Sequence, residues 1–564
     1  MITGPFATHS RRSFLLAMVA ALAVACAGPP RVGDGGKGAI AMPDRHSAET
    51  VLEILDDGGN AVDAAIAAAF VLAVTYPEAG NIAGGGFMLL RFSGHAAFLD
   101  FREIAPAAAT RDMYLDARGE IVDGASLNGH RAVAVPGTVA GLHAAHERYG
   151  TRPWHELLAP AIELAEDGID VPQLLVDRVR DESPRLAGVE SFARHFGHLR
   201  AGQTYRQPEL AAALRRIARH GAAGFYEGET ARLIVDEIRR GGGIVTAADL
   251  AAYRPRWREP LRSRWRDHEI LAAPPPSSGG FAIVQLLKMK DALAPSFAGL
   301  AHNSAQYIHL TAEMEKRVFA DRTEYGGDPD FVRQPVEQLI ADDYIAARAA
   351  EVDPVAISKG PAVRPGLEGR STSHFSIVDR DGNAAALTYT LNTDFGSGVV
   401  VEGGGFLLNN EMDDFSAKPG VTNYYGVTGA EANAIAPGKR MLSSMSPTIL
   451  VSDGRVSMVL GSPGGSTIIT SVYQAIVNVL DFGMSAQQAV AATRFHHQLI
   501  PEDLVTYSVT RPLPEEVVRE LTARGYRAVP HEWEFGDLQL VLRTGDRWSA
   551  ASDPRGRGES RVLD

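Results

Sequence analysis

Residues 373–390 contain two strand-like runs joined by a short polar turn, and this hairpin is the feature that most constrains the fold. Residues 373–378 alternate polar and apolar side chains, as expected of a half-buried strand. Residues 379–383, Asp-Arg-Asp-Gly-Asn, are turn formers, and residues 384–390 supply the returning strand. The segment therefore predicts an antiparallel hairpin.

The length of the turn decides which residues face each other. With a three-residue loop at 380–382, in which Gly382 accepts a positive φ, Thr390 lies opposite Thr372. Asn392 then lies diagonally beyond Thr390 on the same face. A two-residue loop at 381–382 shifts the register by one residue and turns both side chains away. The sequence leaves both registers open.

Thr372 directly precedes the first strand, and it has two interpretations. It can be an ordinary β-branched residue at the start of a strand. It can also be a nucleophile, since a threonine hydroxyl needs a nearby base, and a free α-amine with a reference pKa of about 7.7–8.0 can accept its proton. Cleavage of the Ser371–Thr372 bond would place amine and hydroxyl on one residue.

Outside the hairpin, helical and strand-like patterns come in blocks. Helices are predicted at 59–70, 135–149, 154–167, 207–220 and 466–482, and strands at 87–92, 96–101, 269–273, 448–451 and 456–461. Blocks of both kinds favour a layered α+β architecture. The 564 residues are enough to bury a large core and to form more than one structural unit.

Charge and motif spacing exclude several function classes. The net charge is −13 and basic residues do not cluster along the body, so no nucleic-acid partner is expected. Glycines 84–86 are followed by no Lys-Ser/Thr pair, which argues against a phosphate loop. The adjacent His496 and His497 would diverge on a regular element and have no acidic partner at ligand spacing. We therefore expect no metal and no cofactor.

The N-terminus has the pattern of an export signal, expected at residues 1–25 and followed by a linker at 26–40. Arg11 and Arg12 precede an apolar run, 14–25, that is too short to span a bilayer. Residues 10–15 resemble the twin-arginine pattern used to export folded proteins, with an ordinary signal as the alternative. Either way, the protein is expected outside the cytoplasm, periplasmic or anchored to a membrane.

Cys26 is the only cysteine, so the chain can form no internal disulfide and no Cys-based metal site. Residues 22–26, Leu-Ala-Val-Ala-Cys, resemble a loose lipobox, which would make Cys26 the lipid-accepting residue of a lipoprotein. Alternatively, the Ala-x-Ala pattern marks ordinary signal cleavage and Cys26 is incidental.

Several motifs lie in an order that resembles one enzyme family. They are DFRE at 100–103, PGTVAG at 136–141, TSHFSIVD at 372–379, TYTLN at 388–392, LNNEMDDF at 408–415, LSSMSPT at 442–448, GSPGGS at 461–466, RFHHQ at 494–498 and ASDPR at 551–555. Together they resemble γ-glutamyltransferases, over nearly everything after the linker.

This resemblance implies a four-layer αββα sandwich of the N-terminal-nucleophile hydrolase type. It also implies a precursor cut at Ser371–Thr372 into a large subunit, 41–371, and a small subunit, 372–564. Thr372 would be the nucleophile of both the cleavage and the catalysis, oriented by Thr390. It would pass γ-glutamyl groups from glutathione and related amides to water, amino acids or dipeptides.

The resemblance also assigns a substrate pocket and its surroundings. The α-ammonium would be held by Asn392, Glu411 and Asp414, and the α-carboxylate by Arg102, Ser443 and Ser444. A γ-glutamyl group carries this zwitterion far from its scissile amide, so a pocket with both signs of charge suits it. Gly464 and Gly465 would form the oxyanion hole, and Tyr425 would be the gating aromatic of a covering loop, 419–440.

Two rival functions remain. A glutaryl or cephalosporin acylase of the same superfamily would remove an acyl group that lacks the α-ammonium. Asp414 argues against it, because a buried carboxylate without a cationic partner is costly. A peptide-binding lipoprotein outside the cytoplasm would keep the pocket but never undergo cleavage.

Overall fold

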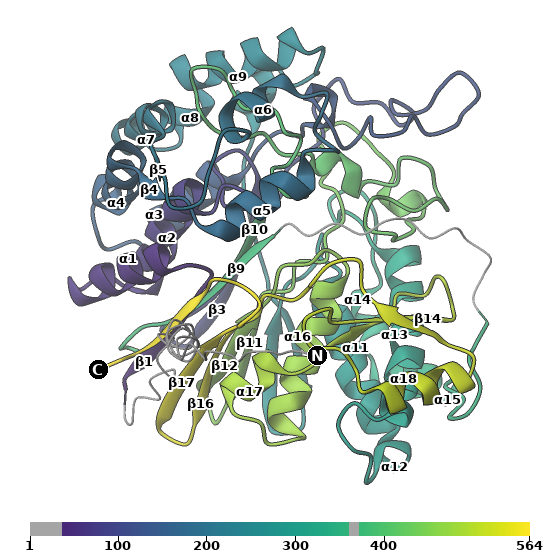
Figure 1. The fold of residues 1–564 in the computed structure, drawn as a ribbon. Helices are drawn as coiled ribbons and strands as arrows, with labels where there is room; N and C mark the ends of the chain where they lie inside the picture. The colour runs from purple at the N-terminus through teal and green to yellow at the C-terminus, as the bar shows by residue number, and fades with distance from the viewer. Residues whose placement is uncertain (1–35, 360–371) are drawn as a thin grey trace, which may run out of the picture.

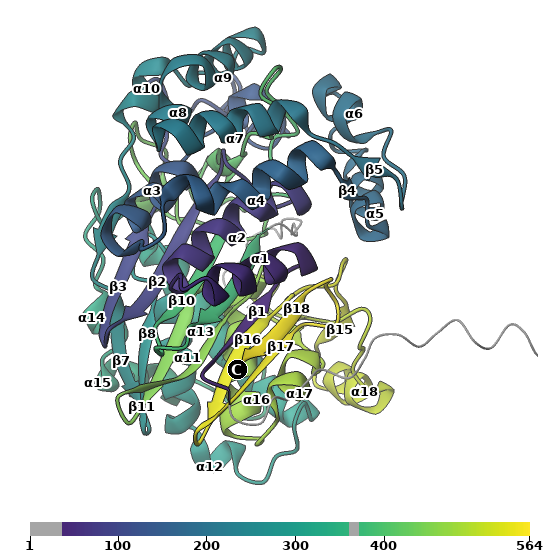
Figure 2. The same cartoon turned by 90° about the vertical axis from the view of Figure 1, so that its left-hand side faces the viewer.

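The computed structural model describes residues 36–359 and 372–564, in which two β-sheets face each other between two layers of helices (Figures 1 and 2). This is the four-layer αββα arrangement expected above. The export signal, Cys26 and Ser371 lie outside the described residues. No helix within 36–359 or 372–564 is long and apolar enough to cross a membrane.

The first sheet has seven strands in the order β18-β1-β9-β10-β2-β3-β6. Their bounds are β18 (Glu559–Leu563), β1 (Gly38–Met42), β9 (Ser373–Val378), β10 (Ala384–Thr390), β2 (Gly85–Phe92), β3 (His95–Asp100) and β6 (Arg256–Arg258). Strands from both sides of the 371–372 boundary therefore share one sheet, so the two predicted fragments form one folded unit.

The second sheet has six strands in the order β17-β16-β12-β11-β8-β7. Their bounds are β17 (Arg547–Ser552), β16 (Gln539–Thr544), β12 (Arg455–Gly461), β11 (Thr448–Ser452), β8 (His268–Ala272) and β7 (Leu261–Trp265). Small sheets are formed by β13 (Phe495–His496), β14 (Leu504–Tyr507) and β15 (Arg527–Pro530), and by β4 (Ile169–Asp170) and β5 (Thr204–Tyr205).

Helices cover the outer faces of both sheets, and α2 is the most fully buried example. Asn60 caps α2 (Ala61–Thr75) in a capping box with Asp63, and every residue of the helix is buried. α1 (Arg45–Asp56) and α3 (Thr138–Tyr149) also contact the first sheet, whereas α4 (Trp154–Asp167) packs on α2 and α7 (Pro208–His220) packs on α4. The second sheet is contacted by α11 (Gly279–Ala292), α16 (Thr467–Leu480) and α17 (Ala486–Ala491), and α13 (Ala305–Tyr325) packs on α11.

The hairpin has the register of the three-residue loop. Ser373 pairs with Tyr389 and Val378 with Ala384, so one further step along the strands places Thr390 across from Thr372. Gly382 has a φ of 79°, as the loop requires. The Asp379 carboxylate accepts backbone N–H bonds from the turn and, at 3.0 Å, from Ala61. The turn is thereby attached to the start of α2.

Alternation along β9 and β10 decides which residues reach the active site. Phe375, Ile377 and Leu387 pack into the core shared with α2, whereas Val378 and Ala386 pack into the core between the sheets. Residues 372 and 390 are even-numbered, like 378 and 386, so their side chains lie on the same face of the sheet as those two. Both threonines therefore face the space between the two sheets.

The predicted elements are present, and some of their ends differ where a cap residue or a proline sets the boundary. The bounds of α4 and β9 match the prediction, but the helix predicted at 59–70 begins one residue after its Asn60 cap and continues to Thr75. The helix predicted at 135–149 begins only at Thr138, directly after Pro136 and Gly137.

Candidate active site at Thr372

Two cavities meet at Thr372. The first is also lined by Thr390, Asn392, Tyr425, Ser443, Ser444 and Gly465, and by Arg102 and Asp414. The second is lined by Gly464 together with residues of α5 (Gln173–Glu182) and of segment 533–537. The structure thus gathers most of the predicted pocket residues in one cavity. Glu411 lies behind it, buried against Arg102.

Asn392 links the end of β10 to the next segment of the pocket wall. Its φ is 81°, in the left-handed region that asparagine tolerates. Its N–H donates to the Thr390 hydroxyl at 2.8 Å, and its side-chain amide donates to the Asn410 carbonyl at 3.1 Å. These bonds fix Thr390 and Asn392 relative to each other beside Thr372.

Arg102 is the centre of a buried charge cluster. Its side chain is 1% exposed, and it lies 2.7 Å from Glu411 and 3.7 Å from Glu103. It also donates a hydrogen bond to the Asp414 carboxylate. Arg102, the predicted ligand of the α-carboxylate, is therefore paired with Glu411 and Asp414, the predicted ligands of the α-ammonium. The cavity has a volume of about 20 Å³, which is room for about one water molecule, so a larger ligand can enter only if side chains that line it move.

Burial and mutual attraction set the protonation of this cluster. Burial opposes the charge on Arg102, but Glu411, Asp414 and Glu103 raise its pKa above the ordinary value. Burial also raises the pKa of Glu411 well above its usual range and that of Glu103 to about 8. Three carboxyl groups share the single charge of Arg102, so burial favours protonation of those that Arg102 does not balance, and a cationic ligand would stabilise their charged forms.

Arg322 of α13 is a second pocket cation, and sequence reasoning missed it. Its Nη2 donates to the Ser444 hydroxyl at 3.2 Å. Within 36–359 and 372–564 no carboxylate forms an ion pair with it, and its Nε has no hydrogen-bond partner. Burial lowers its pKa to about 10, with Asp414 acting in the opposite direction. It therefore carries a largely uncompensated positive charge next to one of the two predicted carboxylate-binding serines.

Gly464 and Gly465 lie between β12 and α16, as the sequence predicted. Their φ values, 128° and 56°, are ones that residues with a Cβ rarely adopt. The Gly464 carbonyl accepts from the N–H of Thr467 at 3.0 Å, at the first turn of the helix. Each glycine lines one of the two cavities at Thr372. This position, at a helix N-terminus beside a hydroxyl nucleophile, suits an oxyanion hole.

Tyr425 closes the first cavity from the covering loop. Its hydroxyl donates to the Asn392 carbonyl at 2.5 Å, and its ring lies so close to Gly465 that a Cβ there would come within 2.3 Å of it. Its own carbonyl accepts from the Gln498 side chain at 3.2 Å. Tyr425, the predicted gating residue, thus connects the covering loop to Asn392 and Gly465 in the wall of the pocket.

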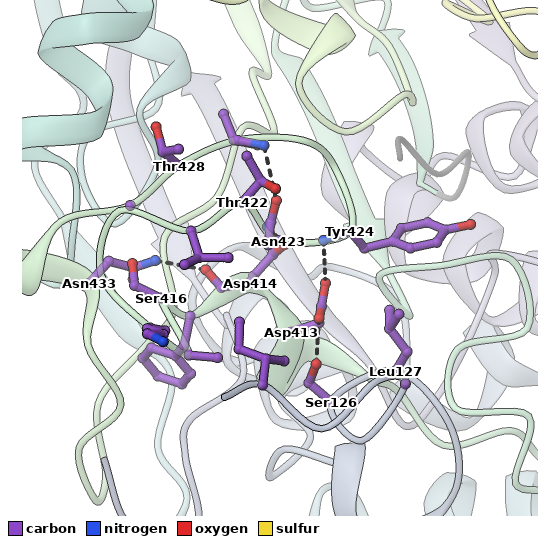
Figure 3. Close-up of a pocket in the computed structure, with 18 of the residues that line it drawn as sticks. Ser126, Leu127, Asp413, Asp414, Ser416, Thr422, Asn423, Tyr424, Thr428 and Asn433 are labelled. Carbon is purple, nitrogen blue, oxygen red and sulfur yellow. Dashed lines mark hydrogen bonds between the residues drawn. The ribbon is translucent and has the colours of Figure 1, made fainter. Parts of the chain in front are cut away.

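The outer side of this loop is anchored on the segment that carries Asp414. Figure 3 shows Asp413 accepting from the Ser126 hydroxyl at 2.6 Å and from the Tyr424 N–H at 3.1 Å. The Asn433 side chain donates to the Asp414 carbonyl at 2.7 Å. A separate cavity of about 570 Å³ lies between this loop and residues 121–128. The covering loop is therefore held by hydrogen bonds to the acidic segment, η2 (Glu411–Asp414).

His496 and His497 point to different partners. His496 bonds to the Thr470 hydroxyl and the Gln498 side chain, and His497 bonds to the Leu504 carbonyl. Burial lowers the pKa of His497 to about 3. In the part of the chain that the structure describes, no three His, Cys, Asp or Glu side chains are grouped to hold a metal ion.

Two stacked sheets between helix layers, with a threonine at the start of a central strand facing the space between the sheets, define the fold of the N-terminal-nucleophile hydrolases. The family model described as Gamma-glutamyltranspeptidase matches residues 47–563. The chain belongs to the γ-glutamyltranspeptidase family.

Individual relatives agree with this assignment. The glutathione hydrolase proenzyme of Pseudomonas aeruginosa is 54% identical over 530 residues, which cover 94% of this chain and 95% of that protein. The crystal structure of cephalosporin acylase from Bacillus halodurans aligns with a TM-score of 0.82 at 27% identity, covering 96% of this chain and 99% of that one. The γ-glutamyltranspeptidase from Pseudomonas nitroreducens complexed with L-DON aligns with a TM-score of 0.57 at 51% identity, covering 58% and 97%.

Proposed function

We propose that the protein is a γ-glutamyl hydrolase and transferase that acts on glutathione and related γ-glutamyl amides. The observation that carries this proposal is a threonine at a strand start sharing one cavity with Arg102 and Asp414. A γ-glutamyl group needs a nucleophile at one end and a binding site for an amino-acid zwitterion at the other. The cavity offers both.

The zwitterion would bind by opening the internal ion pair. Its α-ammonium would take the place of Arg102 beside Asp414, with Asn392 and Glu411 completing the acceptor side. Its α-carboxylate would bind Arg102, Ser443 and Ser444, with Arg322 behind Ser444 adding positive potential. Because the ligand brings both charges, each separated protein group gains a new partner, which offsets the cost of breaking a buried pair.

The reaction then begins with two groups of Thr372 itself, its hydroxyl and its α-amine. Its hydroxyl oxygen attacks the γ-carbonyl carbon while its own α-amine, free after cleavage, accepts the hydroxyl proton. The backbone N–H groups of Gly464 and Gly465 stabilise the oxyanion, and the departing amine leaves with the proton. Attack of water or of an acceptor amine on the acyl-threonine completes hydrolysis or transfer.

Cleavage before Thr372 and export of the precursor belong to the same proposal. The Thr372 hydroxyl oxygen would attack the carbonyl carbon of Ser371 and displace the Thr372 nitrogen, and water would then hydrolyse the resulting ester. The fragment that ends at Ser371 and the fragment 372–564 would remain together because their strands share a sheet. The twin-arginine-like residues 10–15 support a location outside the cytoplasm, and Cys26 is the residue that would carry a lipid anchor. Replacing Cys26 by Ala should move the protein from the membrane fraction to the soluble fraction if the lipid is present.

Identity favours the γ-glutamyl function over the acylase alternative. The glutathione hydrolase proenzyme of Pseudomonas aeruginosa is 54% identical to this chain over 530 residues, whereas the Acylase ACY 1 proenzyme of a Pseudomonas strain is 36% identical over 537 residues. Asp414 agrees with that order, because an acyl group whose carboxylate takes Arg102 away from Asp414 without supplying an ammonium would leave this carboxylate without a cationic partner.

The test is to incubate the purified protein with a chromogenic γ-glutamyl anilide, with and without a dipeptide acceptor. Release of the aniline without acceptor and faster release with acceptor would support both activities. No release by fully processed protein would overturn the proposal.

A further inference from the structure

The second cavity at Thr372 is lined by a different set of residues from the zwitterion pocket. Its lining comes from three places: α5, the segment 76–79, and the residues 533–537 near the start of β16. Asp394 and Gly464 complete it next to Thr372. Thr372 lines both cavities, and the adjacent glycines Gly464 and Gly465 line one cavity each.

Most charged groups around this cavity already have close partners. Arg555 lies 2.8 Å from Glu534, and Glu78 lies 2.9 Å from Arg557. Burial raises the pKa of Asp537 to about 8, so this carboxyl group is mostly neutral near pH 7. Apart from Asp394, the acidic side chains here are thus paired or protonated and oppose an anionic ligand only weakly.

Arg178 of α5 is the exception. Its only ion pair among the described residues is with Asp394, at 3.7 Å, which is beyond hydrogen-bond distance. Its Nη1 atom is buried and has no hydrogen-bond partner in residues 36–359 and 372–564. Leaving a buried donor unpaired is unfavourable, and more so for a charged group. A guanidinium held in this way is ready to bind a carboxylate from outside.

The geometry of amide cleavage says what reaches this side. The γ-glutamyl group fills the first cavity and its carbonyl carbon sits at Thr372, so the amine part of the amide must point away from the zwitterion pocket. The second cavity is the space that opens there from Thr372 and Gly464. Aminolysis of the acyl-enzyme is the reverse of its formation, so an acceptor amine approaches through the same space.

We propose that Arg178 binds the C-terminal carboxylate of the departing peptide and of the incoming acceptor, which makes this cavity a subsite for short peptides with a free carboxylate. This inference rests on the proposed function. Glutathione releases a dipeptide whose amine was bonded to the γ-carbonyl and whose carboxylate lies at its far end. Such a molecule places its amine at Thr372 and its carboxylate along the wall that carries Arg178.

The test compares glycylglycine with glycylglycine amide as acceptors for a γ-glutamyl anilide. The native protein should have a lower KM for glycylglycine than for the amide. Arg178→Gln should raise the KM for glycylglycine about 10- to 100-fold, as expected for the loss of a charged hydrogen bond. The KM for the amide should change by less than about twofold, which a general distortion of the site would not produce. Arg178→Lys keeps the charge and should restore part of the preference.

The matched control is Arg180→Gln, on the same helix, because the Arg180 side chain is 68% exposed and is not part of the cavity lining. It should leave the anilide hydrolysis and both KM values unchanged. Native protein that cleaves the anilide but does not distinguish the two acceptors would overturn this inference alone. Equal losses for both acceptors in Arg178→Gln would do the same. Native, processed protein that fails to cleave the anilide would overturn the proposed function and this inference together.

Discussion

Replacing Asp414 by Asn should weaken γ-glutamyl donors far more than glutaryl donors. The Asp414 carboxylate bonds to Arg102 and is the proposed partner of the substrate α-ammonium. Asn keeps the size of the side chain but removes its charge. A hydrogen bond to a charged group contributes about 1.5–3 kcal/mol, which corresponds to a loss of about 10- to 150-fold in kcat/KM. A glutaryl donor has no ammonium to lose, and Glu411 still balances Arg102, so its loss should stay within about threefold.

The assay measures aniline release from γ-glutamyl and glutaryl anilides at the same enzyme concentration. The control variant is Glu431→Gln, whose side chain lies in the covering loop, is 69% exposed and pairs with Arg111. Its kcat/KM should match the native value for both donors. Equal losses for both donors in Asp414→Asn would refute the reasoning, because the carboxylate would then support the pocket without recognising the ammonium.

Three further predictions concern the proposed oxyanion hole, the covering loop and a buried histidine. Gly464→Ala should lower kcat more than it raises KM. The φ of 128° strains a residue with a Cβ, and that Cβ would lie 2.4 Å from the Thr467 hydroxyl. Steady-state kinetics that show a change in KM alone would contradict this. Tyr425→Phe removes a hydrogen bond to Asn392, worth about 1 kcal/mol, and should lower the ratio of transfer to hydrolysis; product analysis showing an unchanged ratio would count against a lid role. Burial lowers the pKa of His374 to about 3, whereas the unfolded chain takes up this proton near pH 6.5, so stability falls as the pH drops from about 6.5 towards 3. His374→Gln should therefore lose less Tm between neutral pH and about pH 4 than the native protein, and equal losses would argue against this origin.

The hairpin could be predicted because its signals are local. The Asp-Gly turn and the alternation of residues 373–378 together define two registers, and the geometry of Gly382 corresponds to one of them. The position of Thr390 beside Thr372 then follows from strand pairing alone. No contact from outside the segment is needed to derive it.

The charge cluster could not be predicted in the same way, because its members come from distant segments. Arg102 follows β3, Glu411 and Asp414 lie in η2, and Arg322 lies in α13. Motif resemblance predicted that most of them share a pocket, but no spacing in the sequence says that Arg102 and Asp414 bind each other in the empty site. Arg322 was missed because α13 carries charged residues around much of its circumference, and the sequence gives no single face that is buried.

The central claim is that Thr372 becomes an N-terminal nucleophile. Denaturing mass spectrometry of the purified protein, before and after brief exposure to a γ-glutamyl donor, tests it directly. The native protein should show two chains, one beginning at Thr372, and only that chain should gain a γ-glutamyl group, located at Thr372. Thr372→Ala should give a single uncut and unmodified chain. An uncut native chain that still turns over donor, or a γ-glutamyl group on another residue, would contradict the claim.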